Sequence, residues 1–460
     1  MKDARYGTAK SLITKKIGVN YKNFLPQTAR TEERKEIMSE DKTKKLKRPA
    51  FLDDIYRPDA KVGRFLSVLV LFGIAIGLKH GVQNNYLSDI LQVDPNERGI
   101  IDAFRELPGL LLIFILALMY RFADSRVFKV GIALMAGGLA GLFVTSSNEM
   151  FLLKFLVVIF MVLFSTGEHI IMPVRNTIAM DLAKREKTGS SLGITTSTSQ
   201  LGTIAGLLLV TGIFFVLERF KFSRIDLAGY RIVFGIAAAL MAAAAMVAAA
   251  LKETTLKAPR QRFYFAKKFS KYYIMEVFYG SRKQIFLTFG PYVLVREYGA
   301  DPSLMAMLLA ICAVFVMLCS PLIGKLIDKV GYKAVMVGDT LILVIVCIMY
   351  GFAHRMFLPG IALIVICCNF ILDQVISIAS MANNVYVQRI SSNKEEITAT
   401  LSTGISVNHI FSVFIALLGG WIWKTAGIEV LFSLSAVLGL ISSIYAATIK
   451  KSEEVIENQS

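Results

Sequence analysis

From about residue 64 to residue 450, the sequence consists of apolar stretches roughly twenty residues long, separated by short polar loops. A helix of about twenty residues is as long as the hydrocarbon core of a bilayer is thick. About twelve such stretches predict membrane-spanning helices over 64–86, 99–120, 127–146, 150–174, 189–217, 231–251, 272–296, 302–324, 333–353, 357–387, 397–422 and 427–449.

The composition agrees with a membrane protein and excludes most other classes. Hydrophobic residues make up 55% of the 460 residues and charged residues only 18%, whereas a soluble domain is about 25% charged. A soluble enzyme, a secreted disulfide scaffold and a disordered chain are therefore excluded. The five cysteines lie inside apolar stretches, without the spacing of a zinc site. We predict an all-α polytopic membrane protein without a metal site or cofactor.

The distribution of Lys and Arg among the loops predicts the orientation of the chain. The net charge is +17, and cytoplasmic loops of membrane proteins are enriched in basic residues. If the N-terminal tail is cytoplasmic, the inner loops are the more basic ones. One outer loop disagrees, with Arg219, Lys221, Arg224 and Arg231. We expect a multi-pass protein of the cell membrane with both termini cytoplasmic, in contact with membrane lipids and without a nucleic-acid partner.

A basic stretch divides the apolar segments into two groups of six. The predicted organisation is a charged cytoplasmic tail (1–62), an N-terminal six-helix bundle (63–251), a basic cytoplasmic linker (252–271), a C-terminal six-helix bundle (272–450) and a short cytoplasmic tail (451–460). Two halves of equal segment number suggest an internal repeat.

The loop after the second segment of each half carries a related motif. The second copy reads Gly324-Lys-Leu-Ile-Asp-Lys-Val-Gly-Tyr-Lys333, and the first reads Tyr120-Arg-Phe-Ala-Asp-Ser-Arg-Val-Phe-Lys129. Aligned at the Asp, both copies have a basic residue three positions before it, an aromatic residue four after it and a Lys five after it. The first copy lacks both glycines, which would allow a tight turn and close helix approach.

In its place among twelve segments, this motif resembles the G-x-L-x-D-x-x-G-x-[KR] signature of the major facilitator superfamily. The resemblance covers about residues 62 to 450 and implies two pseudo-symmetric six-helix bundles that move by alternating access. It also implies that the motif helps to hold the cytoplasmic face in one conformation; simple anchoring of the charges at the inner surface is the alternative. The candidate gating residues are Asp124, Arg126, Lys129, Gly324, Asp328, Lys329, Gly331 and Lys333.

Polar side chains inside the apolar segments are candidates for a central site, because they are costly in a bilayer and usually face a cavity or a partner. The resemblance implies that the first, fourth, seventh and tenth segments line the cavity, and these segments carry most of them. For Lys79, a side chain that reaches the outer surface is an equal alternative. The candidate substrate-binding residues are Lys79, Gln83, Asn84, Tyr279, Arg282, Lys283, Asn369 and Gln374.

Three carboxyl groups are candidates for proton coupling: Asp373 first, with Glu168 and Glu276 as rivals. A carboxyl group in low-dielectric surroundings binds a proton more readily than one in water. A fixed ion pair between Asp373 and an inward cation is the alternative. Further polar residues are interpreted as an outer gate or a local structural pair (Asp102, Arg105 and Glu106) and as candidates for cavity contacts (Gln200, Asn408 and His409).

The motifs that are missing narrow the function. The sequence contains no P-loop, no H-E-x-x-H and no dinucleotide fingerprint, so it predicts neither an ATP-driven pump nor an enzyme. We predict a monomeric secondary active transporter of a small solute, driven by an ion gradient and most simply by protons. The cations Lys79, Arg282 and Lys283 favour an organic anion or zwitterion. The alternatives are a proton-driven exporter of lipophilic compounds or lipids and a non-transporting membrane sensor with the same fold.

Overall fold

The computed structural model describes residues 50–57, 61–119, 121–184, 187–220, 227–251, 265–392 and 394–449. Most of the predicted N-terminal tail, most of the linker 252–271 and the C-terminal tail lie outside these residues. The chain divides into two units, Met1–Ile55 and Tyr56–Ser460. The described part of the first unit is the short helix α3 (Ala50–Ile55).

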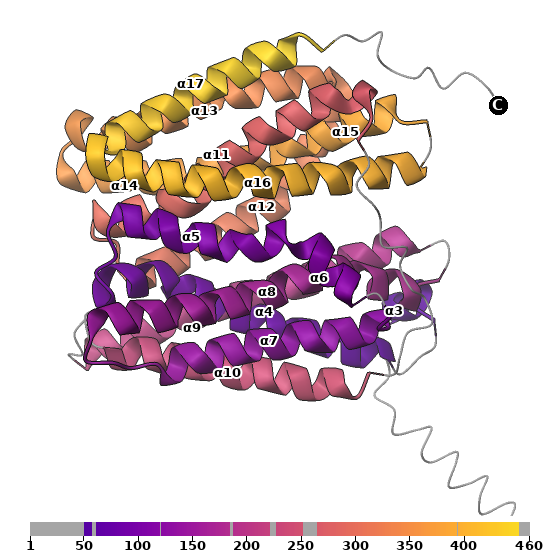
Figure 1. The fold of residues 1–460 in the computed structure, drawn as a ribbon, viewed down its shortest axis with the longest axis horizontal. Helices are drawn as coiled ribbons and strands as arrows, with labels where there is room; N and C mark the ends of the chain where they lie inside the picture. The colour runs from indigo at the N-terminus through magenta and orange to yellow at the C-terminus, as the bar shows by residue number, and fades with distance from the viewer. Residues whose placement is uncertain are drawn as a thin grey trace, which may run out of the picture. The chain divides into compact units, whose positions relative to one another are not determined.

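The second unit is helical, and Figure 1 shows its helices in chain order. The helices of the first half are α4 (Lys61–Asn85, continued by the π-helical turn Tyr86–Ile90), α5 (Pro95–Leu110), α6 (Leu112–Leu118), α7 (Asp124–Val144), α8 (Met150–Leu182), α9 (Thr188–Arg219) and α10 (Leu227–Ala249). The helices of the second half are α11 (Ser270–Arg296), α12 (Pro302–Val330), α13 (Tyr332–Met356), α14 (Pro359–Ser377), α15 (Met381–Ile390), α16 (Lys394–Ala426) and α17 (Ile428–Ala447).

Ten helical stretches among the described residues are long and apolar enough to cross a membrane. The other two predicted segments are also helical, as α5–α6 and α11, but they carry more charged side chains.

Two segments are interrupted. The second divides at Leu111, between α5 and α6, and the tenth divides at the 3₁₀ turn Ile378–Ser380. The predicted all-α membrane fold is confirmed, with these two interruptions.

The internal repeat is visible in a matched pair of lysine contacts. Near the start of α7, the Nζ atom of Lys129 donates to the carbonyl oxygens of Ala249 (3.1 Å) and Leu251 (2.7 Å), at the end of α10. Near the start of α13, the Nζ atom of Lys333 donates to the carbonyl oxygen of Ile449 (2.9 Å), just after α17. The last carbonyl groups of a helix lack intrahelical partners and carry partial negative charge. The ammonium group of a lysine donates hydrogen bonds to these oxygens and compensates their charge.

A second matched pair of contacts involves a basic residue near the start of the first helix of each half. Arg64 of α4 donates from Nη1 to the carbonyl oxygen of Ala250 at 3.2 Å. Lys271 of α11 donates from Nζ to the carbonyl oxygen of Thr448, also at 3.2 Å. In both halves, therefore, the sixth helix ends between cations from the first and third helices.

The two motif copies place their turn on opposite sides of the aligned Asp. Asp124 lies in the first turn of α7, where the helix dipole favours a negative charge. Asp328 lies in the last turn of α12, and the turn follows it at Gly331, whose φ of +88° favours glycine. The residue aligned with Gly331 is Val127, which is already inside α7. The first copy therefore needs no glycine at this position.

The two halves meet at what we call the closed end, where α4, α9, α11 and α16 end and α5 and α12 begin. The Nδ2 atom of Asn85 donates to the carbonyl oxygen of Ala300 at 2.7 Å. The hydroxyl group of Tyr292 donates to the carbonyl oxygen of Val93. Because the acceptors are backbone oxygens in the connections between helices, these bonds fix how the helix ends of the two halves fit together.

Helices α5 and α16 pack against each other across the halves (Figure 1). A β-carbon on Gly99 would overlap the carbonyl oxygen of Ala416, so only glycine permits this approach. At the same end, the Nζ atom of Lys424 lies 2.8 Å from the Oδ2 atom of Asp94, the N-terminal cap of α5. Backbone packing and an exposed ion pair together join α5 to α16.

The contact between α4 and α9 predicts a position-specific effect on stability. A β-carbon on Gly206 would overlap the carbonyl oxygen of Ile74, whereas one on Gly212, in the same helix, has no heavy atom within 4 Å. We expect Gly206→Ala to lower the free energy of unfolding by about 1–3 kcal/mol, and Gly212→Ala to leave it equal or higher. Thermal unfolding in detergent compares the two; equal losses would contradict the tight crossing.

The ion pair at the closed end predicts how closure responds to pH. Partial burial of Asp94 favours its neutral form, but hydrogen bonds from Lys424 and from two backbone N–H groups of α5 outweigh it and hold the pKa of this carboxyl group below its ordinary value. The stabilisation is therefore present at neutral pH and is lost as the pH falls through that lowered value.

Spin labels at Asn148 and Glu297, in a variant without the five native cysteines, report the distance across this end. We expect Lys424→Gln to lengthen or broaden that distance at neutral pH, because Asp94 loses its cation. The unsubstituted protein should do so only below about pH 4. Lys325→Gln, at the end of α12 far from this pair in sequence, is the control; an unchanged distance in Lys424→Gln would show that the pair contributes nothing to closure.

Candidate functional site

A network of paired charges lies on α5. Asp102 is fully buried, and its carboxylate lies 3.1 Å from Nη2 of Arg98 and 2.9 Å from Nε of Arg105. Arg105 also places Nη2 at 2.8 Å from the Oε1 atom of Glu106. The spacings of three and four residues put these groups on one face of the helix. Two cations therefore balance two carboxylates where isolated charges would be strongly disfavoured.

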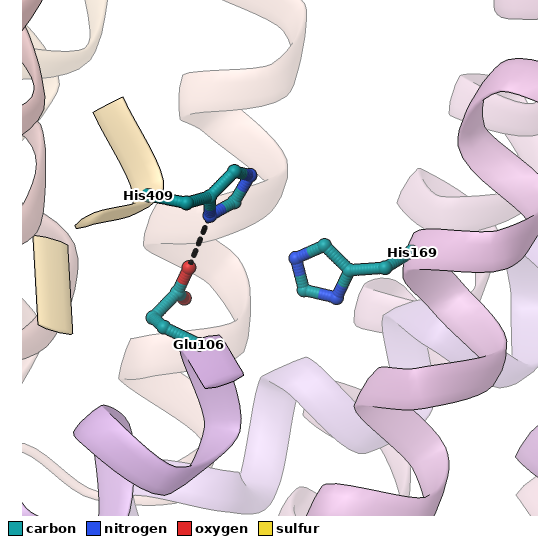
Figure 2. A group of neighbouring side chains, drawn as sticks. All are labelled: Glu106, His169 and His409. Atoms are coloured by element: carbon teal, nitrogen blue, oxygen red, sulfur yellow. Dashed lines mark hydrogen bonds and ion pairs between the residues drawn. The ribbon is translucent and has the colours of Figure 1, made fainter. Parts of the chain in front are cut away.

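The network continues into the second half through a histidine. The other oxygen of Glu106, Oε2, lies 3.1 Å from Nδ1 of His409 on α16. His169 of α8 approaches from the first half, and its ring lies 5.1 Å from that of His409 between centroids. Figure 2 shows the three side chains converging from three helices. All three are buried, so this cluster is a polar connection between the halves.

The candidate residues of α4 lie close to this network. Lys79 is buried, with its Nζ atom 4.4 Å from the centre of the Phe164 ring, and it interacts electrostatically with Glu168 of α8. Lys79 is thus inside the bundle and does not reach the surface. The side-chain oxygens of Gln83 and Asn84 are buried and have no hydrogen-bond partner among the described residues. They are acceptors available to a donor that enters the site.

The candidate substrate-binding residues of α11 divide between two directions. Tyr279 and Arg282 line a pocket within the second half, together with residues of α13 and α17. There the Nη1 atom of Arg282 lies 2.6 Å from Oδ2 of Asp339 on α13. The charge of Arg282 is therefore already compensated by a carboxylate, which sequence analysis did not identify.

Lys283, the neighbouring residue, is exposed and lies midway along the 27-residue helix α11. Its charge interacts with Glu106 of the first half and with Glu276 of its own helix. These interactions indicate that Lys283 is directed toward the region between the halves. Unlike Arg282, it remains accessible.

Glu276 is held by two amides. Asn383 of α15 donates to its Oε1 atom at 3.2 Å, and Asn408 of α16 donates to Oε2 at 3.5 Å. The side chain is buried, and no cation of the described residues lies within ion-pair distance. A carboxyl group bound only by neutral donors keeps its hydrogen bonds whether or not it carries a proton on one oxygen.

Asp373 and its neighbours lie on α14 of the second half. Asp373 is buried and accepts from Nε2 of Gln374 at 3.3 Å, and it interacts electrostatically with Arg282. Among the described residues Asp373 forms no ion pair, the alternative interpretation of this residue, and Arg282 bonds to Asp339 instead. Asn369 donates to the carbonyl oxygen of Val346 on α13, a bond between helices of the same half.

The remaining candidate gating residues have different surroundings. Asp124 is buried at the start of α7, whereas Arg126 is exposed beside the Phe122 ring. Asp328 and Lys329 are exposed at the end of α12. A β-carbon on Gly324 would meet no heavy atom within 4 Å, so the expected close helix approach does not occur there. Their role in gating stays a prediction.

Sequence analysis missed Asp339, His169 and the central position of Glu106. Asp339 and His169 are polar residues within apolar helices, the signal that marked other candidates, and His169 directly follows the candidate Glu168. Glu106 was interpreted, together with Asp102 and Arg105 near the outer end of the second segment, as an outer gate or a structural pair, and it does form an ion pair with Arg105. Only the crossing of α5, α8 and α16 brings Glu106 next to two histidines.

Comparison with known proteins places this arrangement in a family. No curated protein matches the sequence. The nucleoside transporter NupG has a TM-score of 0.67 and 12% identity, over 85% of this chain and 100% of its own. The D-xylose–proton symporter has a TM-score of 0.64 and 14% identity, over 85% of this chain and 98% of its own. The inward-open xylose transporter XylE from E. coli has a TM-score of 0.66 and 13% identity, over 86% of this chain and 97% of its own.

At these identities the solved structures show the fold alone. The sequence profile of the Major Facilitator Superfamily, however, matches residues 63–273 and, a second time, residues 272–459. These two consecutive matches cover the part of the chain that contains both halves. The chain belongs to the major facilitator superfamily and has the fold of its transporters.

Proposed function

We propose that this protein is a proton-coupled secondary transporter of a small organic anion or zwitterion, located in the cell membrane with both termini cytoplasmic. The observation that carries the substrate class is Lys283, an exposed cation midway along α11 and directed toward the first half. The neighbouring Arg282 and the arginines of α5 have carboxylate partners. Among the described residues Lys283 interacts electrostatically with carboxylates but forms no ion pair, so a carboxylate of the substrate would supply its direct partner.

A zwitterion has a further reason to bind there. Glu106 and Glu276 both interact electrostatically with Lys283, so a ligand with both charges finds a cation and carboxylates together. The buried oxygens of Gln83 and Asn84 add acceptors for an ammonium or hydroxyl group. The charges of the site thus favour a polar substrate over a lipophilic one.

Alternating access is supported by where the halves touch. The contacts of Asn85, Tyr292 and Lys424 all lie at the closed end. The basic loops predict that this end faces outward, and on that orientation we propose that this conformation is closed to the outside. We assign proton coupling to Glu276 and Asp373, because both are buried and neither has an ion-pair partner among the described residues.

The role of Lys283 is tested with the purified protein and a panel of organic anions, zwitterions, sugars and lipophilic cations. We expect anions or zwitterions to raise the melting temperature, and Lys283→Gln to weaken their binding about tenfold or more, the range for a hydrogen bond to a charged group. Lys325→Gln, an exposed lysine near the end of α12, should leave binding unchanged. Stabilisation by lipophilic cations alone would support the exporter instead.

Arg282 provides an internal contrast to Lys283. Arg282→Gln leaves the Asp339 carboxylate half-buried without its cation, so we expect a lower melting temperature. The double variant Arg282→Gln/Asp339→Asn should regain most of that loss, because no charge is left unpaired. Substrate selectivity should stay the same in both. A change of selectivity with intact stability would place Arg282 in the substrate site.

Proton coupling is tested by flux in liposomes. Glu276→Gln replaces the carboxyl group with an amide, which can still form hydrogen bonds but cannot exchange a proton. We expect it to abolish accumulation driven by a pH gradient while substrate exchange between the two sides continues. Glu149→Gln, an exposed glutamate before α8, is the control. Binding without any flux in the unsubstituted protein would instead indicate a sensor.

A further inference from the structure

We infer that Glu106, His169 and His409 form a binding site for a divalent transition-metal ion, and that the bound ion clamps the two halves together in this conformation. The inference goes beyond the proposed transport activity and does not depend on the substrate class. It rests on the composition, geometry and surroundings of the cluster in Figure 2.

The donor atoms are already close to one another. One ligand atom from each of the three side chains lies within 4.8 Å of the other two. In a tetrahedral site with bonds of about 2.1 Å, ligand atoms are about 3.4 Å apart. Side-chain movements on the order of 1 Å therefore bring the three donors to coordination distance, without movement of the helices.

The tautomer of His169 is set for metal binding. Its Nδ1 atom lies 2.8 Å from the carbonyl oxygen of Ser165, so Nδ1 carries the proton and donates it. The Nε2 atom then has its lone pair free, and it has no hydrogen-bond partner among the described residues, although the side chain is 95% buried. A histidine whose second nitrogen donates to a backbone carbonyl is the usual arrangement around a bound metal.

The other two ligands are oriented as well. Arg105 binds the Oε1 atom of Glu106 at 2.8 Å, which leaves Oε2 directed at His409. When neutral, His409 would bind a metal through Nδ1 after its proton moves to Nε2, so the net charge of the ring does not change. A protonated His409 would instead release one proton to solvent.

Charge around the cluster does not prevent a cation from entering. Arg105 is shared between the carboxylates of Asp102 and Glu106, and Glu168 interacts electrostatically with His169. Arg105 itself and Lys283 are cations that oppose binding. Two imidazoles and one carboxylate suit zinc, cobalt or iron rather than magnesium or calcium, which prefer oxygen ligands.

Gly109 keeps the space between the imidazoles open. A β-carbon at this position would lie 2.7 Å from Nε2 of His169 and 2.7 Å from Nδ1 of His409. Gly109→Ala therefore obstructs the site while all three ligands remain. Because the ligands come from α5 and α8 of one half and α16 of the other, an ion bound to all three resists separation of the halves.

The first experiment titrates Zn²⁺ into the purified, chelator-treated full chain, with Mg²⁺ as comparison. We expect one Zn²⁺ per chain at micromolar affinity or better, a higher melting temperature, and no response to Mg²⁺. Substituting Co²⁺ should give the intense visible absorption of a four-coordinate ion. The absence of stoichiometric Zn²⁺ binding to the unsubstituted protein would overturn the inference, whatever the variants do.

Variants locate the site. We expect Gly109→Ala, His169→Gln and His409→Gln each to weaken Zn²⁺ binding at least tenfold. His354→Gln, which removes an exposed histidine at the end of α13, should leave the affinity unchanged. Binding that survives the first three substitutions, or that is lost in His354→Gln, places the ion elsewhere and overturns the assignment.

The clamp is tested separately with spin labels at Asn148 and Glu297. Zn²⁺ should narrow the distance distribution across the closed end in the labelled protein but not in its Gly109→Ala variant. Zn²⁺ that binds at the cluster and leaves the distribution unchanged would refute the clamp. Because these readouts need no transport substrate, they can fail while the proposed function holds, and the reverse is also true.

Discussion

The cost of placing charge in a bilayer determines the organisation of this protein's interior. An isolated buried charge is expensive, so each one needs a partner within reach. Asp102 lies between two arginines on its own helix, and Arg282 of α11 pairs with Asp339 of α13. These pairs lie within one half. The pair of Arg282 with Asp339 joins α11 to α13, whereas the charges of α5 compensate one another on that helix and leave Glu106 within reach of His409.

The groups that remain define the interface between the halves. Lys283 is exposed next to the compensated Arg282, and Glu106 reaches across to His409. Near the closed end the contacts are helix-end hydrogen bonds, one exposed ion pair and the glycine approach of α5 to α16. Such contacts are individually weak, so they hold one conformation without preventing a change to another.

The halves are equivalent in how their helix ends are secured rather than in every residue. Lys129 and Lys333 both bind the end of the sixth helix of their half. The chain turns before Asp124 but after Asp328, and only the second turn requires a positive φ. A repeat can therefore lose its glycines and still keep the contact that its lysine makes, because the acceptor is the same exposed helix terminus.

The sequence by itself determined the membrane class, the positions of the helices and the family resemblance, because apolar length and loop motifs are local properties. It also identified Lys79, Lys283, Glu276 and Asp373 as intramembrane polar groups. Only the tertiary structure decided their partners: helical spacing shows which residues share a face, but not which helix that face meets. The pairing of Arg282 with Asp339, and the meeting of Glu106 with His169 and His409, depend on how helices far apart in the chain cross.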